Sequence, residues 1–365
     1  MAEKKQEGKT HIGFKIFIIL LLGIILFFLN EENQIKFIQF INGNLFANLE
    51  PIIEKSISIG EDIEKVFIHG GSIVLWKDNK LIKLDFDGNK QWERDFIFDN
   101  TGISVGEKYI YVFEKPSGII HFLDTNGETA HRVDLETPIV NIVEKDKNVL
   151  VHIIKGNKEG ISTLDMEGNT IDEFLIGDKN ILTYDINEDN FTYIISSLKL
   201  DKNEITSEVQ VFKKGNELLL EKEIKDEMIL YTNFIDKDKV LIMTDGSLYM
   251  LKEKEILWEK EFQLIKDIYV DGSKIYILYG NTIETISIDG ETQEKISFTE
   301  EYKKILPFNG YLIVYGDEYI LGLKKEEELF KYKSEEPILK IIEELDKLIL
   351  IHEDKIELMK FEKKA

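Results

Sequence analysis

Short apolar runs alternate with polar turns from residue 52 onward. Each run is rich in β-branched and aromatic residues, which is typical of a buried strand. Successive runs start 34 to 48 residues apart, which leaves room for several strands in each unit. A repeat near forty residues built from strands predicts an all-β fold, a single β-propeller of four-stranded blades. The runs are IVLW from Ile73, IYVF from Ile110, LVHII from Leu150, YIIS from Tyr193, LIMT from Leu241, IYIL from Ile275, LIVY from Leu312 and LILI from Leu348.

The first and last units predict how the ring closes. In the first unit we expect four strands, at KVFIH, SIVLW, KLIKLDF and KQWERDF. In the last unit we expect only three, at ILKII, LILI and IELMKF. The segment IIEKSISI at 52–59 is free to supply the missing outer strand, which would pair the two ends of the propeller and remove an open sheet edge. This pattern predicts about eight blades, with seven as the alternative because the fourth unit is irregular.

A second repeat follows the third strand of several units. LDFDGNK at 84–90 matches LDTNGET at 123–129, LDMEGNT at 164–170 and ISIDGET at 286–292 without gaps. The acids around Gly88 alternate as in a calcium loop, but an EF-hand has its glycine at position six, and only the glycine recurs in every copy. We interpret the motif as a hairpin turn in which the glycine supplies a positive φ. The residues assigned to these structural turns and to the strands after them are Asp85, Gly88, Trp92, Asp124, Gly127, Asp165, Gly168, Trp258 and Gly290.

The first 51 residues have a different pattern. The stretch IFIILLLGIILFFL at 16–29 is uncharged, and it reaches bilayer length if Lys15 extends to the interface. A secretory signal peptide is the alternative, but no small-residue cleavage site follows. Lysines precede the stretch and glutamates follow it, so the positive-inside rule predicts a single-pass protein of the cell membrane with its N-terminus in the cytoplasm. The expected divisions are a cytoplasmic tail (1–11), a transmembrane helix (12–30), a juxtamembrane linker (31–51) and an extracytoplasmic propeller (52–365).

Charge and cysteine content exclude several classes of function. The chain has a net charge of -23, and residues 1–15 contribute +2, so the remainder carries -25. A field of that sign repels phosphate backbones, and we expect no nucleic-acid partner. The chain contains no cysteine, which excludes disulfides, thiol nucleophiles and a lipoprotein anchor.

The spacing of Asp85, Gly88 and Trp92 resembles the repeat of the quinoprotein-like (PQQ-like) β-propellers, with one residue fewer between Asp and Gly. In that family the tryptophan packs between blades and the glycine turns the chain from the third strand to the fourth. The whole plan is similar to that of uncharacterised membrane-anchored propellers of low-GC Gram-positive bacteria. The resemblance implies a fold and a location but no activity. Cofactor-using members have a vicinal disulfide, which this chain lacks, so we expect no cofactor.

Candidate chemistry is sparse. GISVG at 102–106 matches the G-x-S-x-G pattern around a nucleophile, here Ser104, but no helical pattern follows it. No close metal-ligand spacing joins the histidines, so structural roles are expected for them. Carboxylates at the channel of a propeller can serve a glycosidase, but the sequence does not show which acids converge. The histidines are His11, His69, His121, His131, His152 and His352.

These observations predict a non-enzymatic binding or scaffold module for a protein, peptide or cell-envelope ligand. The alternative is an extracytoplasmic hydrolase or lyase, directed at glycans, with carboxylates at the channel. Antiparallel order places the connections between blades on the same face as the turns from second to third strand. That face and a longer loop, expected at 198–208, are the candidate contact regions. The turns in question are KDNK at 77–80, EKPSG at 114–118 and KGNKEG at 155–160.

Overall fold

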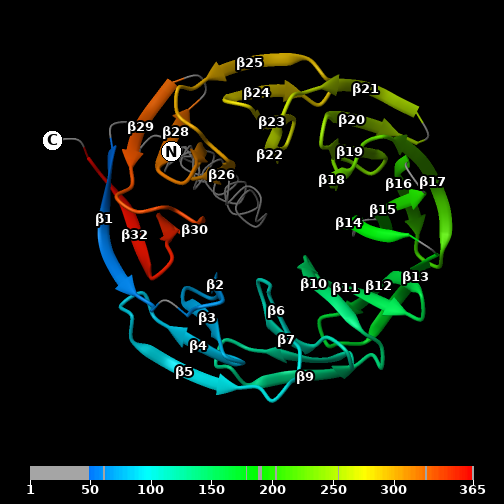
Figure 1. Cartoon of the computed structure of the whole chain (residues 1–365), viewed down its shortest axis with the longest axis horizontal. Helices are drawn as coiled ribbons and strands as arrows, with labels where there is room; N and C mark the ends of the chain where they lie inside the picture. The colour runs from blue at the N-terminus through cyan, green and yellow to red at the C-terminus, as the bar shows by residue number, and fades with distance from the viewer. Residues whose placement is uncertain are drawn as a thin grey trace, which may run out of the picture.

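The computed structural model describes residues 49–60, 62–177, 179–187, 191–201, 204–253, 255–324 and 327–363. Within these residues the chain forms eight antiparallel sheets of four strands each. The sheets are arranged as the blades of a ring around a central channel, with β1 beside β32 (Figure 1). The propeller is therefore eight-bladed, as one of the two counts from the sequence predicted.

Seven blades each consist of four consecutive strands, with the first strand at the channel and the fourth at the rim (Figure 1). They are β2 (Lys65–Ile68), β3 (Ile73–Lys77), β4 (Lys80–Leu84) and β5 (Lys90–Asp95); β6 (Thr101–Val105), β7 (Ile110–Glu114), β8 (Ile119–Leu123) and β9 (Thr129–Asp134); β10 (Ile139–Lys145), β11 (Asn148–Lys155), β12 (Lys158–Asp165) and β13 (Thr170–Ile176); β14 (Asn180–Asn187), β15 (Thr192–Asp201), β16 (Glu204–Lys213) and β17 (Glu217–Lys225); β18 (Ile229–Phe234), β19 (Lys239–Thr244), β20 (Ser247–Lys252) and β21 (Glu255–Glu261); β22 (Ile265–Asp271), β23 (Lys274–Tyr279), β24 (Thr282–Ser287) and β25 (Thr292–Ser297); β26 (Lys304–Phe308), β27 (Tyr311–Tyr315), β28 (Tyr319–Lys324) and β29 (Glu327–Lys333).

The eighth blade joins the two ends of the propeller. It consists of β30 (Lys340–Glu344), β31 (Lys347–Ile351), β32 (Lys355–Lys363) and, as its outer strand, β1 (Leu49–Ser58). The predicted closure is confirmed, although β1 begins at Leu49, before the expected boundary at residue 52. Pro51 is tolerated there because an edge strand leaves one side of its backbone unpaired.

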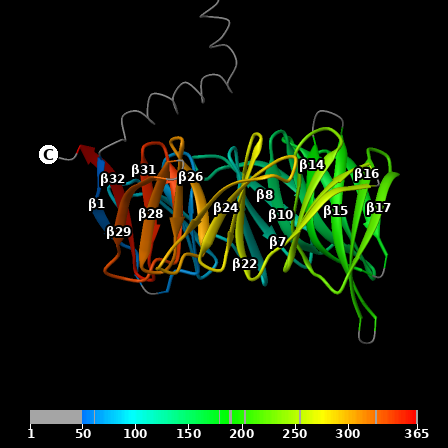
Figure 2. The ribbon, with the colours of Figure 1, turned by 90° about the horizontal axis from the view of Figure 1, so that it is seen from above.

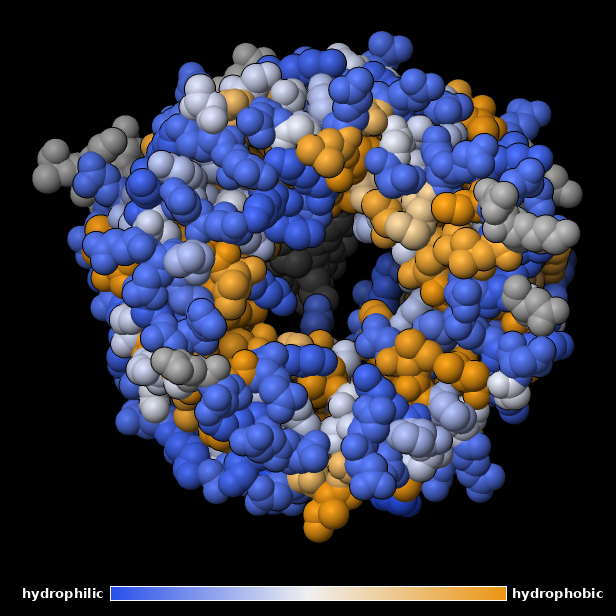
Figure 3. Space-filling model, in the orientation of Figure 1, coloured by the Kyte–Doolittle hydropathy of each residue, from blue (hydrophilic) through white to orange (hydrophobic). Residues whose placement is uncertain are grey.

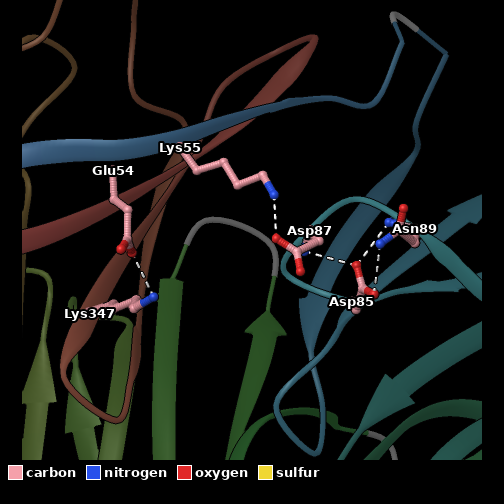
Figure 4. Close-up of polar contacts among 6 residues, drawn as sticks. All are labelled: Glu54, Lys55, Asp85, Asp87, Asn89 and Lys347. Atoms are coloured by element: carbon pink, nitrogen blue, oxygen red, sulfur yellow. Dashed lines mark hydrogen bonds and ion pairs between the residues drawn. The ribbon is translucent and has the colours of Figure 1, made fainter.

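Ion pairs fasten the closing strand on two sides (Figure 4). The Glu54 carboxylate lies 2.7 Å from Lys347 Nζ on β31, within the same blade. Lys55 Nζ lies 2.5 Å from an oxygen of Asp87, in the turn between β4 and β5 of the next blade. The closing strand is thus bound both to its own sheet and to its neighbour.

Apolar side chains fill the spaces between blades. Each of the eight predicted runs lies in the second strand of a blade, and these strands are largely buried, with Ile73, Ile110 and Leu348 fully inaccessible to water. The outer strands alternate between exposed and half-buried positions because one side faces solvent. The core is therefore a ring of separate clusters between adjacent sheets rather than one central mass.

The glycines of the repeated turn lie against the outer strand of the preceding blade. A methyl group added at Gly127 would come within 2.9 Å of the Trp92 ring, and one at Gly290 within 2.8 Å of the Trp258 ring. Both indole nitrogens donate hydrogen bonds to carbonyls of the same turns, at 3.1 Å to Thr125 and 2.7 Å to Ile288. The two tryptophans therefore pack between blades.

The disc has two distinct faces. We call the face that carries the connections between blades and the turns from second to third strand the loop face, and the other the turn face. Residues 77–80, 114–118 and 155–160 all connect second and third strands, so they lie on the loop face. Leu49 and Lys363, paired at the ends of β1 and β32, lie on the turn face.

One expectation about the loop face is wrong. Residues 198–208 are not a long loop, because the ladder between β15 and β16 continues to the pair Asp201 and Glu204. This hairpin projects beyond the disc on the loop face (Figure 2). The many charged residues suggested a solvated loop, but a strand that leaves the disc is solvated on both sides as well.

The predicted membrane helix at 12–30, the tail and most of the linker lie outside the described residues. In the ranges given above, no helix has the length and apolar character needed to cross a bilayer.

The inter-blade role of the turn glycine can be tested with Gly290→Ala. We expect it to lower the free energy of unfolding by about 2–3 kcal/mol, because the new methyl group displaces the Trp258 ring and the backbone keeps a positive φ. The matched control is Gly156→Ala, since Gly156 also has a positive φ but no heavy atom within 4 Å of the added methyl. It should cost about 1 kcal/mol. Equal losses in urea unfolding would contradict the inter-blade contact.

Candidate functional site

The repeated turn uses its acidic residues to hold its own backbone. Asp85 Oδ1 accepts hydrogen bonds from the amides of Asp87 and Asn89, both at 2.8 Å, and Oδ2 accepts one from Asn89 Nδ2 at 3.1 Å (Figure 4). These bonds stabilise the charged carboxylate and lower the pKa of Asp85, and the bond from the backbone amide of Asn89 has the largest effect. Asp124 and Asp165 accept the corresponding amide bonds in their own turns. The geometry is that of a hairpin turn, and the oxygens that a calcium ion would need are engaged.

Carboxylates on the innermost strands join neighbouring blades. Asp267 on β22 accepts a hydrogen bond from the amide of Ile305 on β26 at 2.8 Å. Glu144 on β10 accepts bonds from the amide of Lys108 at 2.9 Å and from the hydroxyl of Tyr111 at 2.5 Å, both in the preceding blade. These acids satisfy backbone and hydroxyl groups of the channel wall, and they therefore serve the assembly of the ring.

Two further acids are buried and fully engaged. Asp185 on β14 is 6% exposed and pairs with Lys145 on β10. Glu284 on β24 is 2% exposed, and its oxygens accept hydrogen bonds from Thr292 Oγ1 at 2.6 Å and from the Tyr279 hydroxyl at 3.1 Å. A carboxylate saturated in this way is a poor proton donor or nucleophile.

A cavity of about 330 Å³ opens on the turn face and is lined by several acidic residues. It lies beside the sixth, seventh and eighth blades, and its lining includes Asp271, Glu294 and Glu343. Tyr269 and Tyr276 also line it, and their rings are stacked with centroids 5.9 Å apart. This cavity combines aromatic surface with carboxylates, so it is the described cavity that best fits a small polar ligand.

Glu343 is the acid in this cavity with the most perturbed titration. The side chain of Glu343 keeps contact with solvent, but partial desolvation by the surrounding protein, and secondarily the charge of Glu344, raise its pKa to about 7. Glu344 follows directly on the same strand and so points to the opposite side of β30. The two do not form a facing pair of carboxylates.

Ser104 and the histidines, which the sequence offered as candidate functional residues, do not come together in one site. Ser104 lies within β6 and pairs with Tyr111 on β7, so the strand-to-helix turn of a nucleophile elbow is not formed there. His152 contacts Glu159 at 3.0 Å, and His352 Nδ1 donates to the Pro337 carbonyl at 2.8 Å. Among the residues that the structure describes, no three His, Asp or Glu side chains are placed to share a metal ion. His69, His121 and His131 lie in two different blades, and His11 is outside the described residues.

A groove of about 700 Å³ opens on the turn face between the fourth and fifth blades. Its walls are mainly aliphatic and include Leu219 and Leu257, which are 42% and 48% exposed. The third-to-fourth turn at this joint, residues 252–255, has no glycine motif to fill the space between blades. This joint therefore lacks the glycine turns that pack against Trp92 and Trp258 at two other joints.

Large apolar side chains are exposed on the loop face. Ile97, Leu264 and Leu339, all in connections between blades, are 99%, 69% and 65% exposed. Figure 3 shows this face, with apolar side chains around the channel mouth and over the blades formed by β14–β21. The sequence predicts contacts on this face but does not point to these residues, because single apolar residues within polar connections do not form a periodic pattern.

Comparisons with known proteins show the fold. The ring is similar to BamB from Moraxella catarrhalis, at 11% identity and a TM-score of 0.60, covering 86% of this chain and 100% of that one. Saccharomyces cerevisiae Sqt1 gives 11% identity and a TM-score of 0.60, covering 86% of this chain and 98% of that one. The Dos1 propeller gives 10% identity and a TM-score of 0.54, covering 82% and 77%.

No curated protein matches the sequence. The model of one family, described as a family of unknown function (DUF5711), matches residues 46–361. This match includes residues of all eight blades.

The raised pKa of Glu343 predicts how the stability of the protein depends on pH. A carboxyl whose folded pKa of about 7 lies above its ordinary 4.5 weakens folding as pH rises through that interval. We expect Glu343→Gln to be more stable than the unchanged protein at about pH 8, by about 1 kcal/mol after allowing for solvent access to the side chain, and equally stable at about pH 4. Thermal unfolding at both pH values measures this. The control Glu353→Gln, on an exposed residue in the loop-face turn between β31 and β32, should show no such pH-dependent gain.

Proposed function

Because the chain belongs to the DUF5711 family, which has no known function, we propose a function from its own surfaces. The protein is a non-enzymatic binding module that presents the loop face of an eight-bladed propeller to a protein, peptide or cell-envelope ligand. Residues 12–30 anchor it in the cell membrane, with the propeller outside. The fold is shown by the structure, whereas the binding role and the location are proposals.

The exposure of apolar side chains on the loop face is the observation that supports the binding role. Ile97, Leu264 and Leu339 extend into solvent from three different connections. Burying a side chain of this size contributes about 1.5–3 kcal/mol, so the face retains a driving force for association that folding has not used. By contrast, the carboxylates of Asp267, Glu144 and Asp185 on the innermost strands are already bonded within the ring.

The position of the chain end supports the orientation. The first described residue, Leu49, lies on the turn face at the start of β1. A membrane anchor preceding it would therefore place the turn face toward the bilayer and the loop face away from it. Excess lysine before residues 12–30 favours an N-terminus in the cytoplasm, which puts the propeller outside.

A second candidate function rests on Glu343. A glycan hydrolase needs one carboxyl that stays protonated near neutral pH, and a pKa of about 7 meets that requirement. The stacked Tyr269 and Tyr276 in the same cavity offer an apolar surface for a sugar ring. This activity would place catalysis on the turn face, independent of the apolar loop face.

One experiment compares both functions. The full chain, crosslinked in its native membrane and captured by a C-terminal tag, should bring down one specific partner. The double variant Leu264→Asp, Leu339→Asp should lower its recovery about tenfold, because it removes the apolar contact surface. The matched control is Leu345→Asp, since Leu345 is 79% exposed but lies in a turn-face hairpin.

Undiminished recovery from the loop-face double variant would contradict the binding role. The same preparations should be incubated with purified cell-wall glycan. Turnover that is present in the unchanged protein and lost in Glu343→Gln, without a specific partner, would establish the enzyme instead.

A further inference from the structure

The β15–β16 hairpin turns one side toward the fifth blade. Ser207 Oγ on β16 donates a hydrogen bond to the Glu227 carbonyl at 2.7 Å and accepts one from the Ile229 amide at 3.2 Å. Both partners belong to the segment that enters the fifth blade. Side chains two positions apart on a strand point to the same side, so Ile205 faces the fifth blade as Ser207 does.

Leu200 shares that side of the hairpin. It is the register partner of Ile205, and residues directly opposite on antiparallel strands project from the same side of the sheet. The amide of Asp226 donates to the Ile205 carbonyl at 2.9 Å, so the connection to the fifth blade runs along the hairpin. Met228 and Leu230 follow on this connection and on the first residues of β18.

These four exposed apolar side chains come from the hairpin and from the adjoining entrance to the fifth blade, and together we call them the hairpin ledge. The hairpin forms the upright wall, and the entrance to the fifth blade forms the floor. Single exposed apolar residues are ordinary on a protein surface, but four on two adjoining segments favour an interaction site. The exposed fractions are 65% for Leu200, 44% for Ile205, 39% for Met228 and 43% for Leu230.

Hydrogen bonds hold the two parts of the ledge together before any partner binds. The ladder between β15 and β16 is paired without a register shift from Thr192 to Asp201, so the upright wall is a continuation of the blade. The bonds of Ser207 and Asp226 hold the floor against it. A surface that does not have to be ordered on binding loses less entropy, which favours affinity.

The charge around the ledge selects the partner. Glu204, Asp226 and Asp245 are exposed beside it, against the lysines Lys199 and Lys225. The chain beyond residue 15 carries a net charge of -25, so the field at the ledge attracts cations and repels acidic surfaces. An apolar segment with basic flanks satisfies both the contact surface and the field.

We propose that the hairpin ledge binds an apolar segment of a partner protein that is flanked by lysine or arginine residues. This inference rests on the proposed binding function and names the site and the partner chemistry for it. The apolar residues of the segment pack between Leu200 and Leu230, and its basic residues lie over the acidic rim.

Site-specific photocrosslinking in the full chain, in its native membrane, tests the proposal. A photoreactive residue replaces Leu200 in one preparation, Leu230 in a second and Leu345, on the turn face, in a third. We expect the first two to crosslink to the same segment of one protein, in which mass spectrometry of the crosslinked peptide locates apolar residues between lysines or arginines. The Leu345 position should not label it. Adding Ile205→Asp should lower the yield at Leu200 about tenfold, with an unchanged melting temperature showing that the propeller remains folded.

Two results overturn the ledge. One is labelling at Leu200 and Leu230 that yields lipid, or several unrelated proteins, or nothing. The other is a labelled segment with acidic flanks. If a photoreactive residue at Ile97 or Leu339 still labels a specific partner, the ledge fails while the binding function stands. If no loop-face position labels any protein and glycan turnover is found, both fail.

Discussion

The pairing of β1 with β32 is the contact on which the rest of the propeller depends. It joins Leu49 to Lys363 and Ser58 to Lys355, residues about as far apart in the sequence as the ring allows. Without it the eighth blade would present an unpaired edge. Ile57 on this strand packs with Ile349 and Ile73, so the same strand also completes the apolar cluster between the last blade and the first. Contacts over such a sequence separation cost loop entropy, and the closure is therefore expected to form late in folding.

Once the ring is closed, its inner strands need partners for polar groups that face a neighbouring blade. Asp267, Glu144 and Asp185 supply them, which gives an acidic chain a structural use for several of its carboxylates. On β30 the pKa values of Glu343 and Glu344 are instead raised, because the protein partly removes water from both carboxyls. Asp267, Glu144 and Asp185 therefore serve the assembly of the ring, while the faces of the disc retain both a groove and exposed apolar residues.

Much of the architecture follows from local patterns in the sequence. The runs that begin at Ile73 and Ile110 recur because each blade needs one strand that is covered on both sides. An apolar run of this kind can be recognised within a single repeat, without knowledge of the neighbouring blade. The turn at Gly88 is recognisable for the same reason, since its geometry is set by residues a few positions apart. The loop that the sequence predicts at Leu200 is a hairpin in the structure, because charged residues indicate solvent contact and do not distinguish a loop from a projecting strand.

The sequence by itself determined the all-β class, the repeat, the closing strand and the acidic charge, because each depends on composition or on spacing along the chain. The tertiary structure alone decided which residues meet. It brought Ile205 beside Asp226, Tyr269 and Glu343 into one cavity, and Trp92 against Gly127. The physical reason is that these contacts lie between segments of different blades or strands, and their distances are set by the closure of the ring rather than by any pattern within one repeat.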